Sequence, residues 1–262
     1  MANGHESVPE KHESGVDVRE TYGPNMGKPG DRDGLHILLA DSLSAAPRGE
    51  PVSGLVLHGY FRSTASYRVR IALNLKGVRY ADAFVHLRNG EQRQPAYRVL
   101  NPQGFVPALS VEGAVLTQSL AICEYLDEVH PTPPLLPGDP LRRAQVRGFA
   151  QVIACDIHPV QNLKVLDRLR ANGLDGEAVK RWAATTIAEG LDACDALIAH
   201  ERGPYCFGEQ VTLADICLVP QLVNARRFGV ALRWPRLEAI ERACLRLEAF
   251  RAAAPENQPD AE

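Results

Sequence analysis

Residues 61–73 read Phe-Arg-Ser-Thr-Ala-Ser-Tyr-Arg-Val-Arg-Ile-Ala-Leu, and they follow Leu-Val-Leu-His-Gly-Tyr at 55–60. The short apolar run predicts a strand, because apolar runs of this length next to turn residues are typical of buried strands. The stretch after it predicts a helix over 66–76, which Gly77 would end. The sequence therefore predicts a sharp turn from strand to helix at 61–65.

Three hydroxyl residues, Ser63, Thr64 and Ser66, lie at this turn. Capping of the helix alone is the simpler interpretation, since hydroxyls are preferred at helix starts. The first N–H groups of a helix lack backbone partners and carry partial positive charge, so the turn also suits an anion such as a thiolate.

Four further stretches, taken with the first, are similar to one known family. They are Leu-Asn-Pro-Gln-Gly-Phe-Val-Pro-Ala-Leu at 100–109, Val-Leu-Thr-Gln-Ser-Leu-Ala-Ile at 115–122, Cys-Asp-Ile-His-Pro-Val-Gln-Asn-Leu at 155–163 and Leu-Val-Pro-Gln-Leu-Val-Asn-Ala-Arg-Arg-Phe at 218–228. Together they resemble the zeta class of glutathione transferases over about residues 55–259. The class includes isomerases that act on maleyl-substituted oxo acids.

The order of elements predicts an α/β domain followed by an all-α domain. Strands are expected at 55–60, 79–86, 106–111 and 114–117, and helices at 66–76, near 95–100 and at 119–130. Parallel strands need helical crossovers, so this order implies a thioredoxin-like domain with a four-stranded mixed sheet. Helices at 141–169, 177–199, 213–228 and 235–252 would then form the helical domain, the arrangement of the glutathione transferase fold.

The domain organisation follows from composition. Residues 1–54 are rich in Gly and Pro and hold one aromatic residue, Tyr22, so we expect a mostly disordered extension. The thioredoxin-like domain is expected at 55–131, the helical domain at 141–262, and the Pro-rich segment 132–140 between them reads as a linker.

Bulk properties exclude several classes of function. The chain has 262 residues, is 45% hydrophobic and carries a net charge of −3, which does not suggest a nucleic-acid surface. Its apolar runs are shorter than the roughly 18 residues that a membrane span needs, so we expect a soluble, cytoplasmic protein without a membrane partner. The six cysteines are expected to be reduced core thiols. Cys155 and His158 alone do not make a metal site.

The resemblance implies that glutathione is the cofactor and suggests where its parts bind. The γ-glutamyl carboxylate is expected at Gln118 and Ser119, where a predicted helix start offers a hydroxyl and unpaired N–H groups. The cysteinyl unit is expected to pair with the backbone of Val106, because the family has a cis bond before the proline that stands here as Pro107.

The other glutathione contacts are assigned in the same way. The glycyl end is expected at Gln92 and Gln103. The thiol is expected at the 63–66 turn, with Ser63 the first candidate for the activating hydroxyl and Thr64 the second. Ala65 stands where many members of the class have cysteine, so the reaction would need no protein thiol at this position.

Cations are expected to hold the acidic substrate. Arg62 and Arg227 match family positions that contact substrate carboxylates, and guanidinium suits a carboxylate through paired hydrogen bonds. Each taken alone is an ordinary surface arginine. His158 and Asn162, spaced to share one helix face, match positions that line the cleft, or form a buried polar pair before Pro159. A close branch of the family has arginine after the asparagine, where this chain has Leu163.

The predicted function is that of a glutathione-dependent cis–trans isomerase that acts on a small dicarboxylate, maleylacetoacetate or maleylpyruvate, in the degradation of aromatic compounds. One alternative is a glutathione transferase or peroxidase that acts on other electrophiles. A second is a non-catalytic scaffold with the same fold. The resemblance also implies a homodimer.

Overall fold

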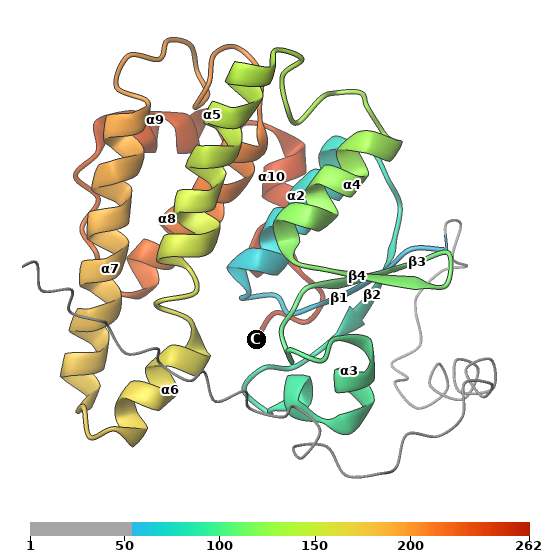
Figure 1. Cartoon of the computed structure of the whole chain (residues 1–262), viewed down its shortest axis with the longest axis vertical. Helices are drawn as coiled ribbons and strands as arrows, with labels where there is room; N and C mark the ends of the chain where they lie inside the picture. The colour runs from blue at the N-terminus through green and yellow to red at the C-terminus, as the bar shows by residue number, and fades with distance from the viewer. Residues whose placement is uncertain (1–53) are drawn as a thin grey trace, which may run out of the picture. The chain divides into compact units, whose positions relative to one another are not determined.

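Residues 54–262 are described by the computed structural model, and they fall within one compact unit (Figure 1). The expectation of disorder for 1–54 concerns residues that lie outside the described part, apart from Gly54. In residues 54–262, no helix is both long enough and apolar enough to cross a bilayer.

The sheet has four strands, β1 (Val56–Gly59), β2 (Ala81–Phe84), β3 (Ala108–Val111) and β4 (Ala114–Thr117). Their spatial order is β2-β1-β3-β4; β1 pairs in parallel with β2, and the other two pairings are antiparallel. The mixed four-stranded sheet is thus confirmed. The strand expected over 79–86 is shorter at both ends.

Helices cover both faces of this sheet. They are α2 (Thr64–Leu75), α3 (Pro95–Leu100), which follows the short turn η2 (Glu91–Arg93), and α4 (Ser119–Val129). Figure 1 shows α2 and α4 on one side of the sheet and α3 on the other. Buried side chains such as Leu57, Ile71 and Leu109 belong to the core under α2.

The first helix begins two residues earlier than the sequence predicts. Ser63 has extended backbone angles (φ −70°, ψ 118°) and is the N-cap, since its side chain accepts a hydrogen bond from the Ser66 N–H. The helical stretch therefore includes Thr64 and Ala65, and the β1–α2 turn is tighter than expected.

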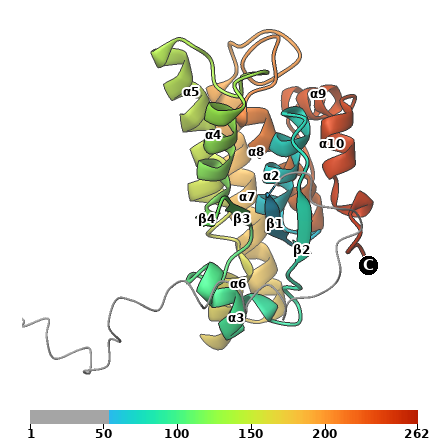
Figure 2. The ribbon, with the colours of Figure 1, turned by 90° about the vertical axis from the view of Figure 1, so that its right-hand side faces the viewer.

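The rest of the chain is helical and packs against α2 from the side away from the sheet (Figure 2). Its elements are α5 (Pro140–Gln151), η3 (Val152–Ile157), α6 (Leu163–Ala171), α7 (Gly176–Leu197), α8 (Leu213–Arg227), α9 (Pro235–Cys244), α10 (Glu248–Ala253) and the short turn η4 (Pro255–Asn257).

Two long helices of the prediction are wrong, because each is broken. The helix expected over 141–169 widens into the π-helical segment η3 and stops before α6. Pro159 has no N–H and its ring clashes with the preceding turn, which ends the helix there. His158 and Asn162 therefore lie on either side of a break and do not share a helix face. The helix expected over 235–252 is divided into α9 and α10 at an extended Leu247.

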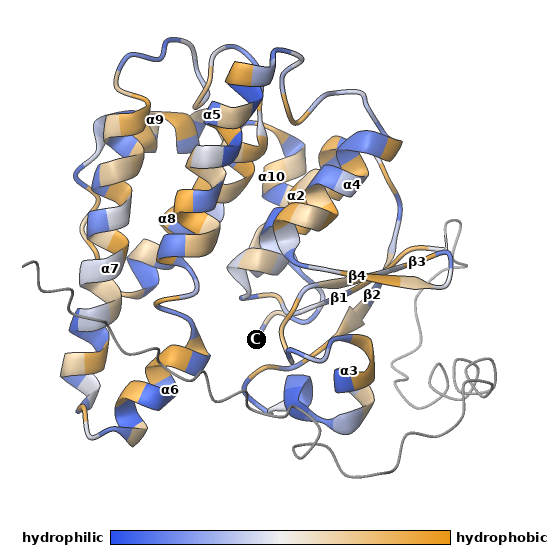
Figure 3. Cartoon of the chain, in the orientation of Figure 1, coloured by the Kyte–Doolittle hydropathy of each residue, from blue (hydrophilic) through white to orange (hydrophobic). Residues whose placement is uncertain are grey.

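Helix α8 is buried along most of its length, and its apolar residues appear in orange in Figure 3. It begins with a capping box, in which the Asp215 carboxylate accepts the Thr212 N–H at 2.8 Å. The same carboxylate accepts the Cys206 N–H at 2.8 Å. Five of the cysteines are buried as expected, whereas Cys155 is exposed.

Candidate functional site

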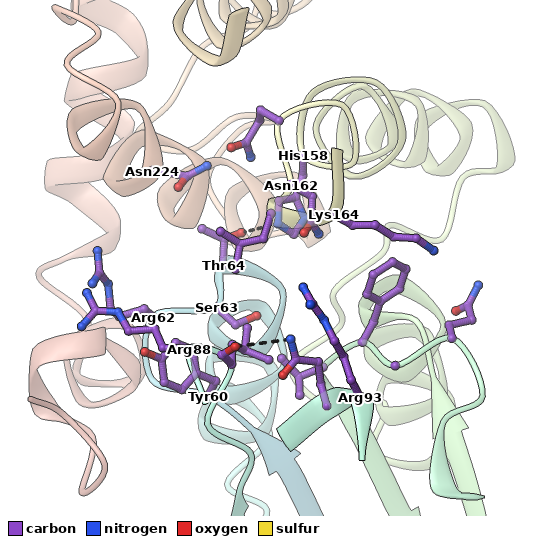
Figure 4. Close-up of a pocket in the computed structure, with 18 of the residues that line it drawn as sticks. Tyr60, Arg62, Ser63, Thr64, Arg88, Arg93, His158, Asn162, Lys164 and Asn224 are labelled. Atoms are coloured by element: carbon purple, nitrogen blue, oxygen red, sulfur yellow. Dashed lines mark hydrogen bonds between the residues drawn. The ribbon is translucent and has the colours of Figure 1, made fainter. Parts of the chain in front are cut away.

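A cavity of about 810 Å³ opens at the β1–α2 turn (Figure 4). Its walls come from the loops around α3 and from the break between η3 and α6. The C-terminal end of α8 completes it. The lining residues are Tyr60, Arg62, Ser63, Thr64, Leu87, Arg88, Gln92, Arg93, Arg98, Gln103, Gly104, Phe105, Val106, His158, Gln161, Asn162, Leu163, Lys164, Asn224, Arg227 and Phe228.

The two hydroxyls at the start of α2 have different partners. Oγ of Ser63 accepts a hydrogen bond from the Ser66 N–H at 3.1 Å, which leaves its own O–H available to donate into the cavity. Oγ1 of Thr64 lies 3.0 Å from Nε2 of His158. The Thr64 hydroxyl is therefore already engaged within the protein.

His158 is a neutral imidazole at this site. His158 lines the cavity, yet the surrounding protein desolvates its ring. This desolvation, with a smaller effect of the Arg68 guanidinium, lowers its pKa to about 3. A histidine with so low a pKa carries no charge near neutral pH. It can hold the Thr64 hydroxyl, but it adds no positive charge to the cavity.

The backbone of Val106 is free to pair with a ligand. The bond between Val106 and Pro107 is cis, as expected, and Val106 lines the cavity just before β3 begins. Within residues 54–262, neither its N–H nor its C=O has a hydrogen-bond partner. A free N–H and a free C=O on the same residue can hold an extended peptide as an added strand would be held.

The predicted γ-glutamyl site lies at the edge of the cavity. Neither Gln118 nor Ser119 is among the lining residues, but Nε2 of Gln118 donates to Oε1 of Gln103 at 2.8 Å, and Gln103 lines the cavity. Gln118 has a left-handed φ of 70°. Ser119 is buried, and its Oγ accepts a hydrogen bond from Nη1 of Arg68 at 3.2 Å.

Basic side chains outnumber acidic ones on the cavity wall, and two of them, Arg88 and Arg93, form ion pairs with Glu262 and Asp167, which lie outside the lining. Within residues 54–262, the cavity lining contains six Arg and Lys side chains and neither Asp nor Glu. The six are Arg62, Arg88, Arg93, Arg98, Lys164 and Arg227. Such a wall favours an anionic ligand, because fixed charges of one sign in a cleft raise the local concentration of the opposite ion.

The two predicted substrate arginines are joined to each other. Nη1 of Arg227 donates to the Arg62 carbonyl at 2.6 Å, so the end of α8 is tied to the β1–α2 turn. Burial lowers the pKa of Arg227, and the nearby Arg62 lowers it further. Within the described residues, no carboxylate forms an ion pair with either arginine.

Several lining residues were missed in the sequence analysis. Figure 4 shows Tyr60 and Arg88 beside Arg62, and Lys164 near Asn162. Nζ of Lys164 lies 5.2 Å from the centre of the Phe105 ring. A close branch of the family has arginine at the position where this chain has Leu163. The next position supplies a cation, which the break at Pro159 places at the cavity.

Sequence profiles described as the N-terminal and C-terminal domains of glutathione S-transferase match residues 62–129 and 164–246. Maleylacetoacetate isomerase from Pseudomonas aeruginosa is 53% identical over 208 residues, which cover 78% of this chain and 97% of that protein. The holo structure of a maleylpyruvate isomerase, described as a bacterial glutathione S-transferase of the zeta class, is 48% identical with a TM-score of 0.77, covering 79% of this chain and 100% of that one. The chain belongs to the zeta class of glutathione transferases.

A further relative has been solved with ligands. Maleylacetoacetate isomerase from Anaeromyxobacter dehalogenans, with dicarboxyethyl glutathione and citrate in its active site, is 41% identical with a TM-score of 0.73. The alignment covers 80% of this chain and 95% of that one. Both ligands of that protein carry several carboxylates.

Proposed function

We propose that this zeta-class protein is a glutathione-dependent cis–trans isomerase of maleylacetoacetate or maleylpyruvate, with a role in the degradation of aromatic compounds. The observation that carries the proposal is the juxtaposition of a helix-start hydroxyl, Ser63, with a cavity lining of six basic residues and no carboxylate, of which Arg62 and Arg227 have no ion-pair partner within residues 54–262. A thiolate and a dicarboxylate both need this environment.

The residues present fit glutathione. Val106 offers a free N–H and C=O to the cysteinyl unit, and Ser63 offers a free O–H to the thiol. The Gln118–Gln103 pair and Ser119 offer donors to the two carboxylate ends. We assign binding of glutathione to Ser63, Gln92, Gln103, Val106, Gln118, Ser119, His158 and Asn162.

When bound, glutathione supplies a thiolate that adds to the maleyl double bond, allows rotation and is expelled unchanged. Ser63 and the first N–H groups of α2 stabilise the negative sulfur and lower the pKa of the thiol. Thr64 is held by His158 and sets the shape of the turn. Arg62 and Arg227 bind the substrate carboxylates and stabilise the negative charge that spreads onto the substrate carbonyl during the reaction.

The test is to incubate the protein with each maleyl substrate, with and without glutathione, and to follow loss of the cis isomer. Glutathione-dependent isomerisation is expected for at least one substrate. If 1-chloro-2,4-dinitrobenzene or a hydroperoxide reacts faster than either maleyl substrate, the transferase or peroxidase alternative is favoured. Such an enzyme has no use for the arginine pair. No turnover of any of these would favour the scaffold.

We place the protein in the cytoplasm, where glutathione is abundant, and we propose a homodimer, as is usual in the family. Light scattering at micromolar concentration should give twice the mass of the chain, and a monomeric mass would contradict the dimer.

A further inference from the structure

A second hollow, of about 510 Å³, adjoins the main cavity. The two share three lining residues, all of them arginines: Arg62, Arg88 and Arg227. The rest of the second lining comes from the β1–α2 turn and from the tail after α10, with Phe61, Pro255, Glu256, Ala261 and Glu262. Figure 4 shows Arg88 beside Arg62. The three guanidinium groups therefore stand where the two hollows meet.

Arg88 is tied to the tail by one carboxylate. Its Nη1 donates to Oε2 of Glu262 at 3.2 Å, and Oε1 of the same carboxylate is hydrogen-bonded to Nε2 of His86. The hydrogen bond with His86 and the charges of Arg88 and Arg62 hold the pKa of Glu262 below its usual range, so the group is ionised near neutral pH. Because Glu262 lines the second hollow and not the main cavity, it holds Arg88 at the boundary between them.

The tail is also fixed next to Arg62. Oδ2 of Asp260 accepts the Phe61 N–H at 2.9 Å, and Phe61 directly precedes Arg62 in the chain. Two carboxylates of one short segment thus bind the two loops that carry Arg62 and Arg88. The segment thereby sets where these two arginines lie relative to each other.

Arg88 keeps most of its hydrogen-bond donors free. Glu262 accepts from Nη1, and within residues 54–262 the Nε and Nη2 of Arg88 have no partner. A guanidinium edge of this kind can bind a carboxylate through two parallel hydrogen bonds. The side chain of Arg88 is 59% exposed, so a ligand can reach it.

The proposed substrates carry one carboxylate at each end of the molecule. The first is attached to the double bond at which the thiolate adds, so it lies near Ser63 and within reach of Arg62, the preceding residue. The second is separated from the double bond by a dioxo chain and therefore lies farther from the sulfur. Arg88 offers a cation at that distance, and the second hollow beside it has room for the end of the chain.

We infer that Arg88 is a specificity-determining residue, which binds the substrate carboxylate remote from the double bond, and that Glu262 positions it. The inference rests on the proposed function for its substrate. It adds a contact that distinguishes dicarboxylates from maleyl compounds whose far end is neutral. Glu262 acts through Arg88 and does not itself contact the substrate.

Maleylacetone provides the test, because it has the maleyl carboxylate and the dioxo chain but ends in a methyl group. Steady-state rates at saturating glutathione give kcat/KM for maleylacetone and for maleylpyruvate or maleylacetoacetate. The wild-type protein should prefer the dicarboxylate. Arg88→Met should lower kcat/KM for the dicarboxylate by about tenfold or more, as expected for loss of hydrogen bonds to a charged group, and for maleylacetone by less than about threefold.

Glu262→Gln tests the positioning role. It should reduce the preference for the dicarboxylate by about two- to fivefold, the range for an exposed ion pair. It should have no further effect when combined with Arg88→Met, because it acts only through Arg88. Glu256→Gln is the matched control. It removes another negative charge from the second hollow, but Glu256 does not bond to Arg88, so the preference should stay unchanged. Equal effects of the two glutamate substitutions would contradict the positioning role.

The substituted side chains, Arg88, Glu256 and Glu262, are all exposed, so the variants should keep the wild-type thermal midpoint. Three results would overturn the inference: an equal loss with both kinds of substrate in Arg88→Met, no loss with either, or no preference of the wild-type protein for the dicarboxylate. If the wild-type protein isomerises none of these compounds in the presence of glutathione, it is the proposed function that fails.

Discussion

Thr64 and His158 meet in the wall of the cavity, with Oγ1 of Thr64 3.0 Å from Nε2 of His158. The contact joins the start of α2 to the end of η3, residues that are 94 positions apart. Because His158 is neutral, it can hold the Thr64 hydroxyl without adding charge. The finding favours Ser63, whose O–H is free, as the group that stabilises the thiolate.

Ser63→Ala should raise the pKa of the bound glutathione thiol by about one to two units, because a hydrogen bond to a charged group contributes about 1.5–3 kcal/mol. Turnover should fall, with glutathione affinity largely retained. The ultraviolet absorbance of the thiolate, followed against pH, measures the shift. Asp175→Ala is the control, since it removes another N-cap, at α7, and should cost about 1 kcal/mol of stability without changing the thiol.

Thr64→Val should remove the contact with His158 and leave the pKa of the bound thiol within about half a unit of its wild-type value, well below the shift expected for loss of a hydrogen bond to the anion. The same absorbance titration checks this. A shift in Thr64→Val together with none in Ser63→Ala would reverse the two assignments.

Arg227→Gln should raise the KM for the dicarboxylate substrate by about tenfold or more and leave the thiol pKa unchanged, because the guanidinium serves the other reactant. Steady-state kinetics at saturating glutathione measures it. The control is the neighbouring Arg226, which pairs with the buried Glu241 carboxylate at 2.5 Å and does not line the cavity. Arg226→Gln should lower the thermal midpoint and leave KM unchanged. Equal effects on KM would argue against a contact between Arg227 and substrate.

His158 should make the fold sensitive to acid. Its pKa is about 3 in the folded protein and 6.5 as the ordinary value, so between these values the unfolded chain binds a proton that the folded chain does not. The free energy of unfolding therefore falls as pH is lowered from about 6.5 towards 3. Denaturant unfolding of His158→Gln should show a shallower loss over this range. The exposed His200→Gln should follow the wild-type curve, and identical curves for all three proteins would contradict the assignment.

The order of strands and helices could be predicted from the sequence because it depends on local signals: apolar runs, a glycine at a helix end and a proline-rich linker. The Ser63 cap and the Thr212 capping box are local in the same way, since donor and acceptor lie three residues apart. The early start of α2 was missed because Ser63, Thr64 and Ser66 are all suitable N-cap residues, and the sequence alone does not show which of them has the extended cap conformation.

The cation wall could not be predicted in full, because it depends on which distant loops meet. Arg88 and Arg93 lie between β2 and α3, and Lys164 lies after the break at Pro159. A single sequence shows these as ordinary charged residues. Likewise, Arg68 and Arg70 look equivalent in sequence, and only the packing around α2 shows that one is fully partnered and the other is not.

The most direct test of the central claim is the number of substrate molecules isomerised per glutathione molecule. The protein is mixed with an excess of maleylpyruvate or maleylacetoacetate over glutathione, and the fumaryl product and the free thiol are both measured to completion. The account predicts that product greatly exceeds the glutathione added while the thiol is fully recovered. Loss of one thiol for each substrate consumed, or product formation that does not depend on glutathione, would contradict it.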